Sequence, residues 1–141
     1  MVKKKVKKKV KKKGWIVGAG KGIKESERGH VYKRKQGLNW VSHPLSEKVK
    51  LGFMVTKKDE KVDVTCLLAK IPKGSEVPVH SHEGNDILFP LSGKGKVWID
   101  GLGELELKRG VLVNIPPKIP HKVFDVTEEL EVYDVFSPAI L

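Results

Sequence analysis

The sequence predicts a small all-β barrel or sandwich behind a basic N-terminal arm. From about residue 49, nine short runs of strand-forming residues are separated by turn residues, which is typical of small all-β domains. No segment after residue 49 has a helical period of apolar residues. With 141 residues and 39% hydrophobic side chains, the chain has room for one domain with a real core.

The positive charge of the chain is concentrated at its N-terminus. The formal net charge is +11, from 28 Lys and Arg against 17 Asp and Glu, and residues 1–13 contain nine lysines in a Val-Lys-Lys-Lys repeat. So many like charges oppose a helix, so we expect residues 1–13 to form a disordered arm. Such an arm is a solvated tail, or it makes a weak, salt-sensitive contact with a polyanion. The nearly neutral remainder argues against a domain built around a nucleic acid.

Residues 14–48 are expected to form an N-terminal extension with irregular and edge-strand segments. Its run Gly18-Ala19-Gly20-Lys21-Gly22 is not a phosphate-binding loop, because Gly22 stands where such a loop needs Ser or Thr. We expect His30 and His43, which lie in this extension, to face solvent. No apolar segment reaches membrane-spanning length, so we expect a cytoplasmic protein without membrane insertion.

The barrel domain is expected over residues 49–141. Asp100-Gly101 between two strand runs indicates a hairpin, and Ser92-Gly93 and Arg109-Gly110 mark further turns. Pro90 removes a backbone donor, so its strand lies at an edge or is bulged there. The expected strands are Val49–Val55, Val62–Ile71, Val77–His82, Ile87–Leu91, Lys96–Ile99, Glu104–Lys108, Val111–Ile115, His121–Val126 and Leu130–Phe136.

Three histidines and one carboxylate are candidate metal ligands. His80 and His82 are separated by one residue in an expected strand, so both side chains point to one face. Asp86 follows four residues later, and His121 begins a later strand. Three imidazoles and a carboxylate suit Fe, Mn, Ni, Zn or Co and leave positions open for water or substrate. The His-x-His pair alone is weak evidence, because two surface histidines on an exposed strand give the same pattern.

Glycines and prolines at fixed spacings surround these residues. The first block reads Gly74-x5-His80-x-His82-x3-Asp86-x6-Gly93, and the second reads Gly110-x5-Pro116-x4-His121-x3-Asp125. The two blocks resemble the two-part motif of the cupin superfamily, and the spacing matches at every fixed position. Three identities differ, because Asp86, Lys118 and Asp125 stand where the family has Glu, Gly and Asn.

The resemblance implies a double-stranded β-helix, the jelly-roll barrel of the cupins, with one divalent transition metal in its mouth. Its ligands would be His80, His82, Asp86 and His121. Asp86 is one methylene shorter than Glu, so Glu83 and Asn85 are alternatives for the fourth ligand, as is a site of three histidines.

The resemblance also bears on local backbone and on assembly. Lys118 replaces the family's Gly without strain only if the backbone there avoids positive φ. Asp125 lies near the end of a strand, where a structural role is expected. Small cupins usually pair, which implies a homodimer, and residues 31–41 are our candidates for its packing.

The function implied by the resemblance is metal-dependent catalysis. We expect an oxygenase, or an isomerase or lyase, acting on a small polar molecule such as a sugar or an organic acid. Glu83 is the nearest candidate for a catalytic base, and Trp98, Tyr133 and Phe136 are candidates for lining the substrate pocket. The alternative is a non-catalytic cupin that binds or senses a small ligand, with the basic arm contacting an anionic partner. The fold does not decide between them, because this barrel hosts many chemistries.

Overall fold

Two units make up the part of the chain that the structure, a computed structural model, describes, namely residues 10–18 and 20–141. In the first unit, residues 1–32, strand β1 (Val10–Lys12) pairs antiparallel with β2 (Trp15–Val17). A 3-10 turn (Glu25–Glu27) and the one-turn helix α1 (Arg28–Val31) follow. The predicted disordered arm lies outside the described residues at positions 1–9.

The second unit, residues 33–141, is the barrel. It confirms the predicted all-β jelly roll, and its helical content is limited to a 3-10 turn (Lys35–Gly37) and α2 (Lys57–Glu60). The side chain of Thr56 begins α2 by accepting a hydrogen bond from the Asp59 amide at 3.1 Å. The strands are β3 (Trp40–His43), β4 (Ser46–Val55), β5 (Thr65–Ile71), β6 (Val77–His80), β7 (Asn85–Ile99), β8 (Gly103–Lys108), β9 (Val113–Ile115) and β10 (His121–Ser137).

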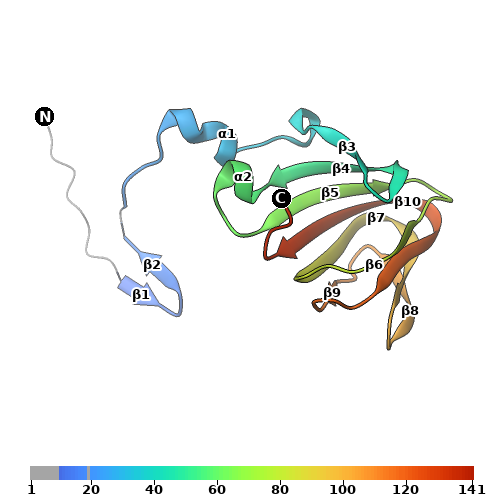
Figure 1. The fold of residues 1–141 in the computed structure, drawn as a ribbon. Coiled ribbons are helices and arrows are strands. Elements are labelled where there is room, and N and C mark those ends of the chain that lie inside the picture. Colours follow the sequence, from blue (N-terminus) through green and yellow to red (C-terminus); the bar gives the residue numbers. More distant parts are fainter. Residues whose placement is uncertain (1–9, 19) are drawn as a thin grey trace, which may run out of the picture. The chain divides into compact units, whose positions relative to one another are not determined.

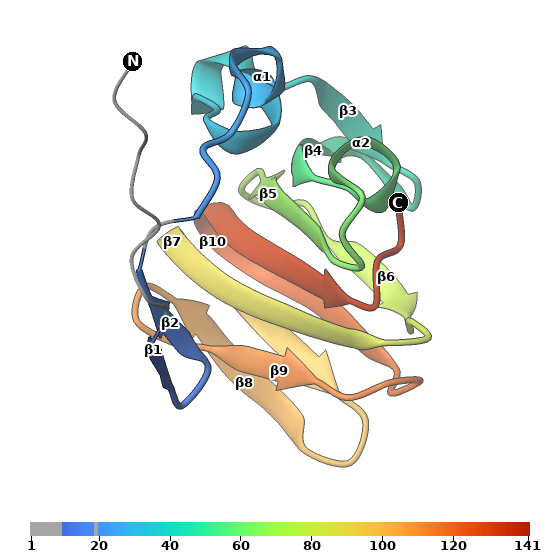
Figure 2. The same cartoon turned by 90° about the vertical axis from the view of Figure 1, so that its left-hand side faces the viewer.

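All the strand pairs of the barrel are antiparallel, in the order β3-β4-β5-β10-β7-β8. Strand β6 pairs with the start of β10, and β9 pairs with the start of β7. Figures 1 and 2 show β5, β10 and β7 side by side, with β8 and β9 beyond β7. The barrel consists of two layers of strands, and the long strands β7 and β10 therefore run through both of them.

Strands β7 and β10 each join two strands that we predicted as separate. The turn predicted at Ser92-Gly93 is wrong, because β7 runs through it opposite a stretch of β10 where the register shifts. Gly93 has φ +90°, and a Cβ there would lie 2.0 Å from the carbonyl oxygen of Glu129. A bulge that requires glycine therefore occupies this position. The bulge predicted at Pro90 is confirmed by a register shift beside its partner Val132.

The core fills the space between the layers, with residues from β4 through β10. Leu107 of β8 is fully buried, whereas Leu105 on the same strand is 40% exposed. None of the helices in the described residues is both long and apolar enough to cross a membrane. The core residues are Val49, Leu51, Leu67, Ala69, Ile71, Val77, Leu88, Val97, Ile99, Leu107, Val113, Ile115, Val123, Val126, Leu130, Val132 and Phe136.

Candidate metal site

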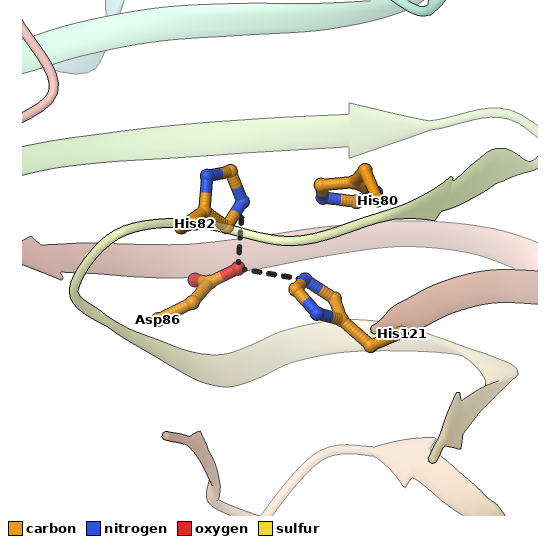
Figure 3. Close-up of side chains that lie close together, drawn as sticks. All are labelled: His80, His82, Asp86 and His121. Atoms are coloured by element: carbon orange, nitrogen blue, oxygen red, sulfur yellow. Dashed lines mark ion pairs between the residues drawn. The ribbon is translucent and has the colours of Figure 1, made fainter. Parts of the chain in front are cut away.

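Four predicted ligands meet at one end of the barrel. His80 ends β6 and is the cross-strand partner of His121, which begins β10, while Asp86 lies near the start of β7. His82 lies just beyond β6, because this strand ends at His80, two residues before its predicted end. One donor atom from each of the four residues lies within 4.8 Å of the others. Figure 3 shows the four side chains pointing toward a common centre.

Backbone carbonyls fix the ring orientation of two of these histidines. His80 Nδ1 donates to the carbonyl oxygen of Pro78 at 2.7 Å, and His121 Nδ1 donates to that of Ile119 at 2.9 Å. In the neutral rings, Nε2 therefore carries the lone pair. A backbone acceptor on the far ring nitrogen is the usual partner of a metal-binding histidine.

The polar atoms at the centre of the group lack partners. Among the described residues, His82 Nε2, His121 Nε2 and Asp86 Oδ1 are buried without a hydrogen bond. The Oδ2 atom of Asp86 lies 3.5 Å from His82 Nε2 and 3.3 Å from His121 Nε2. Buried polar atoms normally have a hydrogen-bond partner. These three atoms have none, and each can offer a lone pair to a cation held between them.

The charge states of the group also suit a cation. Burial lowers the pKa of His80 and of His82 below the ordinary 6.5, although the nearby Asp86 acts in the opposite direction. Both rings are therefore neutral at pH 7, with a free lone pair. Burial alone would raise the pKa of Asp86, but contacts with Asp134, His121 and His82 reverse this, and its pKa is lowered. Asp86 is thus a carboxylate beside neutral imidazoles.

A second carboxyl, Asp134 on β10, lies next to the site and was not predicted from the sequence. Burial, followed by the charge of Asp86, raises the pKa of Asp134 well above its ordinary value, which favours the protonated, neutral form of this side chain. Its Oδ1 is buried without a partner in the described part of the chain. Asp134 is recognisable in the sequence only by its position, two residues before Phe136 on the inner face of an expected strand.

A cavity of about 360 Å³ opens beside two of the four candidate ligands, His80 and His82. Its polar lining residues are His43, His80, Ser81, His82 and Asp134. The rest of its wall is largely apolar, with Leu51, Phe53, Leu67, Phe136, Ile140 and Leu141. A pocket of this size with few polar groups is typical of small-molecule sites.

The other candidates for the fourth ligand lie elsewhere. The side chain of Glu83 is 89% exposed, with Oε2 3.9 Å from the Nζ of Lys118. Asn85 donates a hydrogen bond from Nδ2 to Oδ1 of Asn114 at 2.9 Å. The structure therefore gathers Asp86 with the histidines and leaves Glu83 and Asn85 outside the group.

Of the three aromatic residues predicted for the pocket, one lines it. The Phe136 ring packs against His82 with centroids 4.8 Å apart and forms part of the cavity wall. Trp98 and Tyr133 alternate with buried neighbours on β7 and β10, so they lie on the outer face of the sheet. The structure gives Trp98 and Tyr133 no place in the described cavity wall.

The two departures from the motif in the second block both have left-handed backbone. Lys118 has φ +64° and Asp125 has φ +47°. We expected Lys118 to replace the family's Gly without strain only if its backbone avoids positive φ, and the backbone of Lys118 does not avoid it. Asp125 lies on the surface with Oδ2 3.4 Å from Lys96 Nζ.

His43 is a residue of the cavity that the sequence did not reveal. We expected it to face solvent, but it is only partly exposed, and it lines the cavity beside His80, with ring centroids 6.1 Å apart. It reaches the site because the hairpin of β3 and β4 adds to β5. No local pattern around residue 43 encodes that position.

Comparison with known proteins places this barrel in a family. Residues 67–136 match the Cupin domain family, and solved cupin structures share the fold. The chain belongs to the cupin superfamily. This cupin is 36% identical over 59 residues to the uncharacterized protein MJ1618 of Methanocaldococcus jannaschii, which covers 41% of this chain and 46% of that protein. The chain thus spans about half the length of the curated relatives it matches.

Two solved structures illustrate the shared cupin fold. An RmlC-like cupin from Shewanella frigidimarina has a TM-score of 0.66 at 19% identity, over 78% of this chain and 92% of that one. A predicted oxalate decarboxylase from Thermotoga maritima has a TM-score of 0.64 at 21% identity, over 74% and 96% of the two chains. At these identities the likeness establishes the fold alone.

Proposed function

We propose that this cupin is a metal-dependent enzyme, an oxygenase or an isomerase or lyase, acting on a small polar molecule such as an organic acid or a sugar. The observation that carries the proposal is the set of four donor atoms within 4.8 Å of one another, with His82 Nε2 and His121 Nε2 buried and unpartnered in the described structure. A first-row divalent metal (Fe, Mn, Ni, Zn or Co) suits these ligands.

In this proposal the chain's own residues divide into three roles. His80, His82, Asp86 and His121 hold the cation, and the carbonyl oxygens of Pro78 and Ile119 orient two of the rings. The bound cation would supply a Lewis acid that polarises a substrate oxygen. The apolar wall, with Phe136 beside His82, would keep bulk water from the reacting group.

One observation favours the alternative of a non-catalytic binding or sensor cupin. Glu83, our candidate base, lies in solvent rather than in the cavity. Proton transfer in the cavity would therefore depend on another group. The two candidates differ in turnover, and substrate panels on the metal-loaded protein distinguish them: oxygen consumption if the metal is iron, and isomerase or lyase assays otherwise.

Metal content is the test of the site itself. Elemental analysis of protein purified without an affinity tag is expected to find near one equivalent of metal in the wild type. The double variant His82→Ala, His121→Ala is expected to lose it, while the control variant His30→Ala keeps it. Wild-type protein that stays metal-free and takes up no added ion would make the histidines structural.

We also propose that the cupin forms a homodimer. Strand β3 pairs only with β4 among the described strands, so the outer edge of β3 is available for pairing with a second chain. Residues 31–41, our candidates for this packing, lead into β3 and include Trp40 and Val41. Sedimentation analysis measures the mass directly, and a mass of one chain would exclude the dimer.

A further inference from the structure

His43 lines the cavity, and its ring has one defined hydrogen-bond donor. The backbone N–H of Leu45 donates to His43 Nδ1 at 2.9 Å. The neutral ring therefore carries its hydrogen on Nε2. Nε2 makes no hydrogen bond to any residue that the structure describes, so this N–H is available to a ligand.

The cavity wall limits what that ligand can be. Five of the lining residues are polar, while the remaining wall is aliphatic and aromatic. None of the lining residues is Lys or Arg. A sugar would bury several hydroxyls against this wall without partners, at a cost for each. A molecule with one polar end and an apolar body meets no such cost.

We propose that the cavity binds a small carboxylate with an apolar body, and that His43 Nε2 donates a hydrogen bond to the carboxylate. This inference rests on the proposed metal site, which would hold the same head group from the other side. It narrows the substrate class from small polar molecules to apolar-bodied acids. His43 acts here as a positioning and specificity residue, since it is not one of the four grouped ligands.

Binding of three probe acids to Co²⁺-loaded protein tests the substrate class. Co²⁺ gives visible absorption bands that change when a ligand enters its coordination sphere, so binding is read without any turnover. Benzoate, acetate and gluconate share a carboxylate but differ in the rest of the molecule. Benzoate is expected to bind at least tenfold more tightly than acetate, because its ring is buried against the apolar wall. Gluconate is expected to bind no better than acetate.

Two variants of His43 test the hydrogen bond. In His43→Asn, the side-chain amide still offers an acceptor to the Leu45 N–H but has no atom at the Nε2 position. In His43→Gln, the amide nitrogen lies near the Nε2 position and can donate. We expect benzoate affinity to fall about tenfold in His43→Asn and to stay within about threefold of wild type in His43→Gln. Both variants are expected to take up Co²⁺ as the wild type does.

The possible outcomes separate this inference from the proposed function. Failure of the wild-type protein to take up Co²⁺ would refute the metal site, and the inference would fall with it. Normal Co²⁺ uptake with unchanged benzoate affinity in His43→Asn would overturn the role of His43 alone. Tighter binding of gluconate than of benzoate would overturn the substrate class. Loss of Co²⁺ from His43→Asn would make His43 a ligand instead of a positioning residue.

Discussion

The backbone N–H of Lys118 donates a hydrogen bond to the carbonyl oxygen of His82, with nitrogen and oxygen 2.7 Å apart. This bond ties the segment that leads into His121 to the segment that carries His82. The two halves of the ligand set are thereby held at a fixed spacing through the backbone. Lys118 adopts φ +64° at this point, a conformation that glycine tolerates better than lysine.

Replacing Lys118 with glycine is expected to stabilise the protein. Lys118→Gly removes a Cβ from a left-handed position, which should raise the free energy of unfolding by about 0.5–1 kcal/mol. Lys118→Ala is the matched control, because it keeps the Cβ and removes only an exposed side chain whose distant contact with Glu83 contributes little. Urea unfolding measures both. Equal stability of the two variants would contradict the argument from φ.

The pH dependence of stability should expose Asp134. In the unfolded chain this carboxyl has an ordinary pKa of 3.8, whereas burial raises its pKa well above that in the fold. As pH rises above 3.8, the unfolded chain releases the proton that the folded chain retains, so the folded state loses stability. This loss continues until the pH passes the raised pKa.

The variant Asp134→Asn has no proton to release and keeps a similar shape. In metal-free protein, its stability relative to wild type should therefore increase as pH rises from about 4 to 8, by at most about 1.4 kcal/mol per pH unit. Titration of Asp86 does not contribute to the difference between the two proteins over this pH range, because its pKa is lowered below the ordinary 3.8. Denaturant unfolding at a series of pH values provides the measurement, and parallel profiles would show that Asp134 titrates normally.

Two glycines of the motif make a matched pair for stability. Both have positive φ, +90° at Gly93 and +89° at Gly110, but only Gly93 faces a close neighbour. Gly110→Ala should cost about 1–2 kcal/mol for its backbone conformation. Gly93→Ala should cost about 3 kcal/mol or more, because the new Cβ also collides with the Glu129 backbone. Similar urea midpoints for the two variants would mean that β10 gives way at the bulge.

The basic arm is tested by deletion. Removal of residues 1–13 takes away nine lysines and leaves 19 Lys and Arg against 17 Asp and Glu. Retention on immobilised heparin at low salt should be lost in the shortened protein and should fall steeply with salt in the full chain. Metal content is the control and should not change. Retention that survives the deletion would place the polyanion contact on another surface.

The sequence predicted the barrel and the candidate ligands for a physical reason. His80, His82, Asp86 and His121 lie at the ends of strands whose turns are fixed by glycine and proline, so spacing along the chain translates directly into position in space. Tyr133 and Phe136 are three residues apart, which in a strand places them on opposite faces. That signal was present in the sequence, and it would have removed Tyr133 from the predicted pocket.

Other features depended on contacts that local patterns do not encode. Ser92-Gly93 is compatible with a turn or with a bulge, and only the approach of the Glu129 backbone selects the bulge. The place of His43 depends on how the β3–β4 hairpin adds to β5, which involves pairing between residues far apart in the chain. The raised pKa of Asp134 likewise arises from burial beside Asp86.

His43 lies on a hairpin outside residues 67–136, the stretch that matches the cupin family. The four grouped donors all lie within that stretch. Other residues of the cavity wall lie outside it in the sequence: before it His43, Leu51 and Phe53, and after it Ile140 and Leu141. Mutation can therefore reshape the entrance to the barrel without altering a single donor atom. In the course of evolution, the residues that line the cavity and the four grouped donors are free to change separately. Likeness over the shared stretch is for this reason a poor guide to the molecule that this chain recognises.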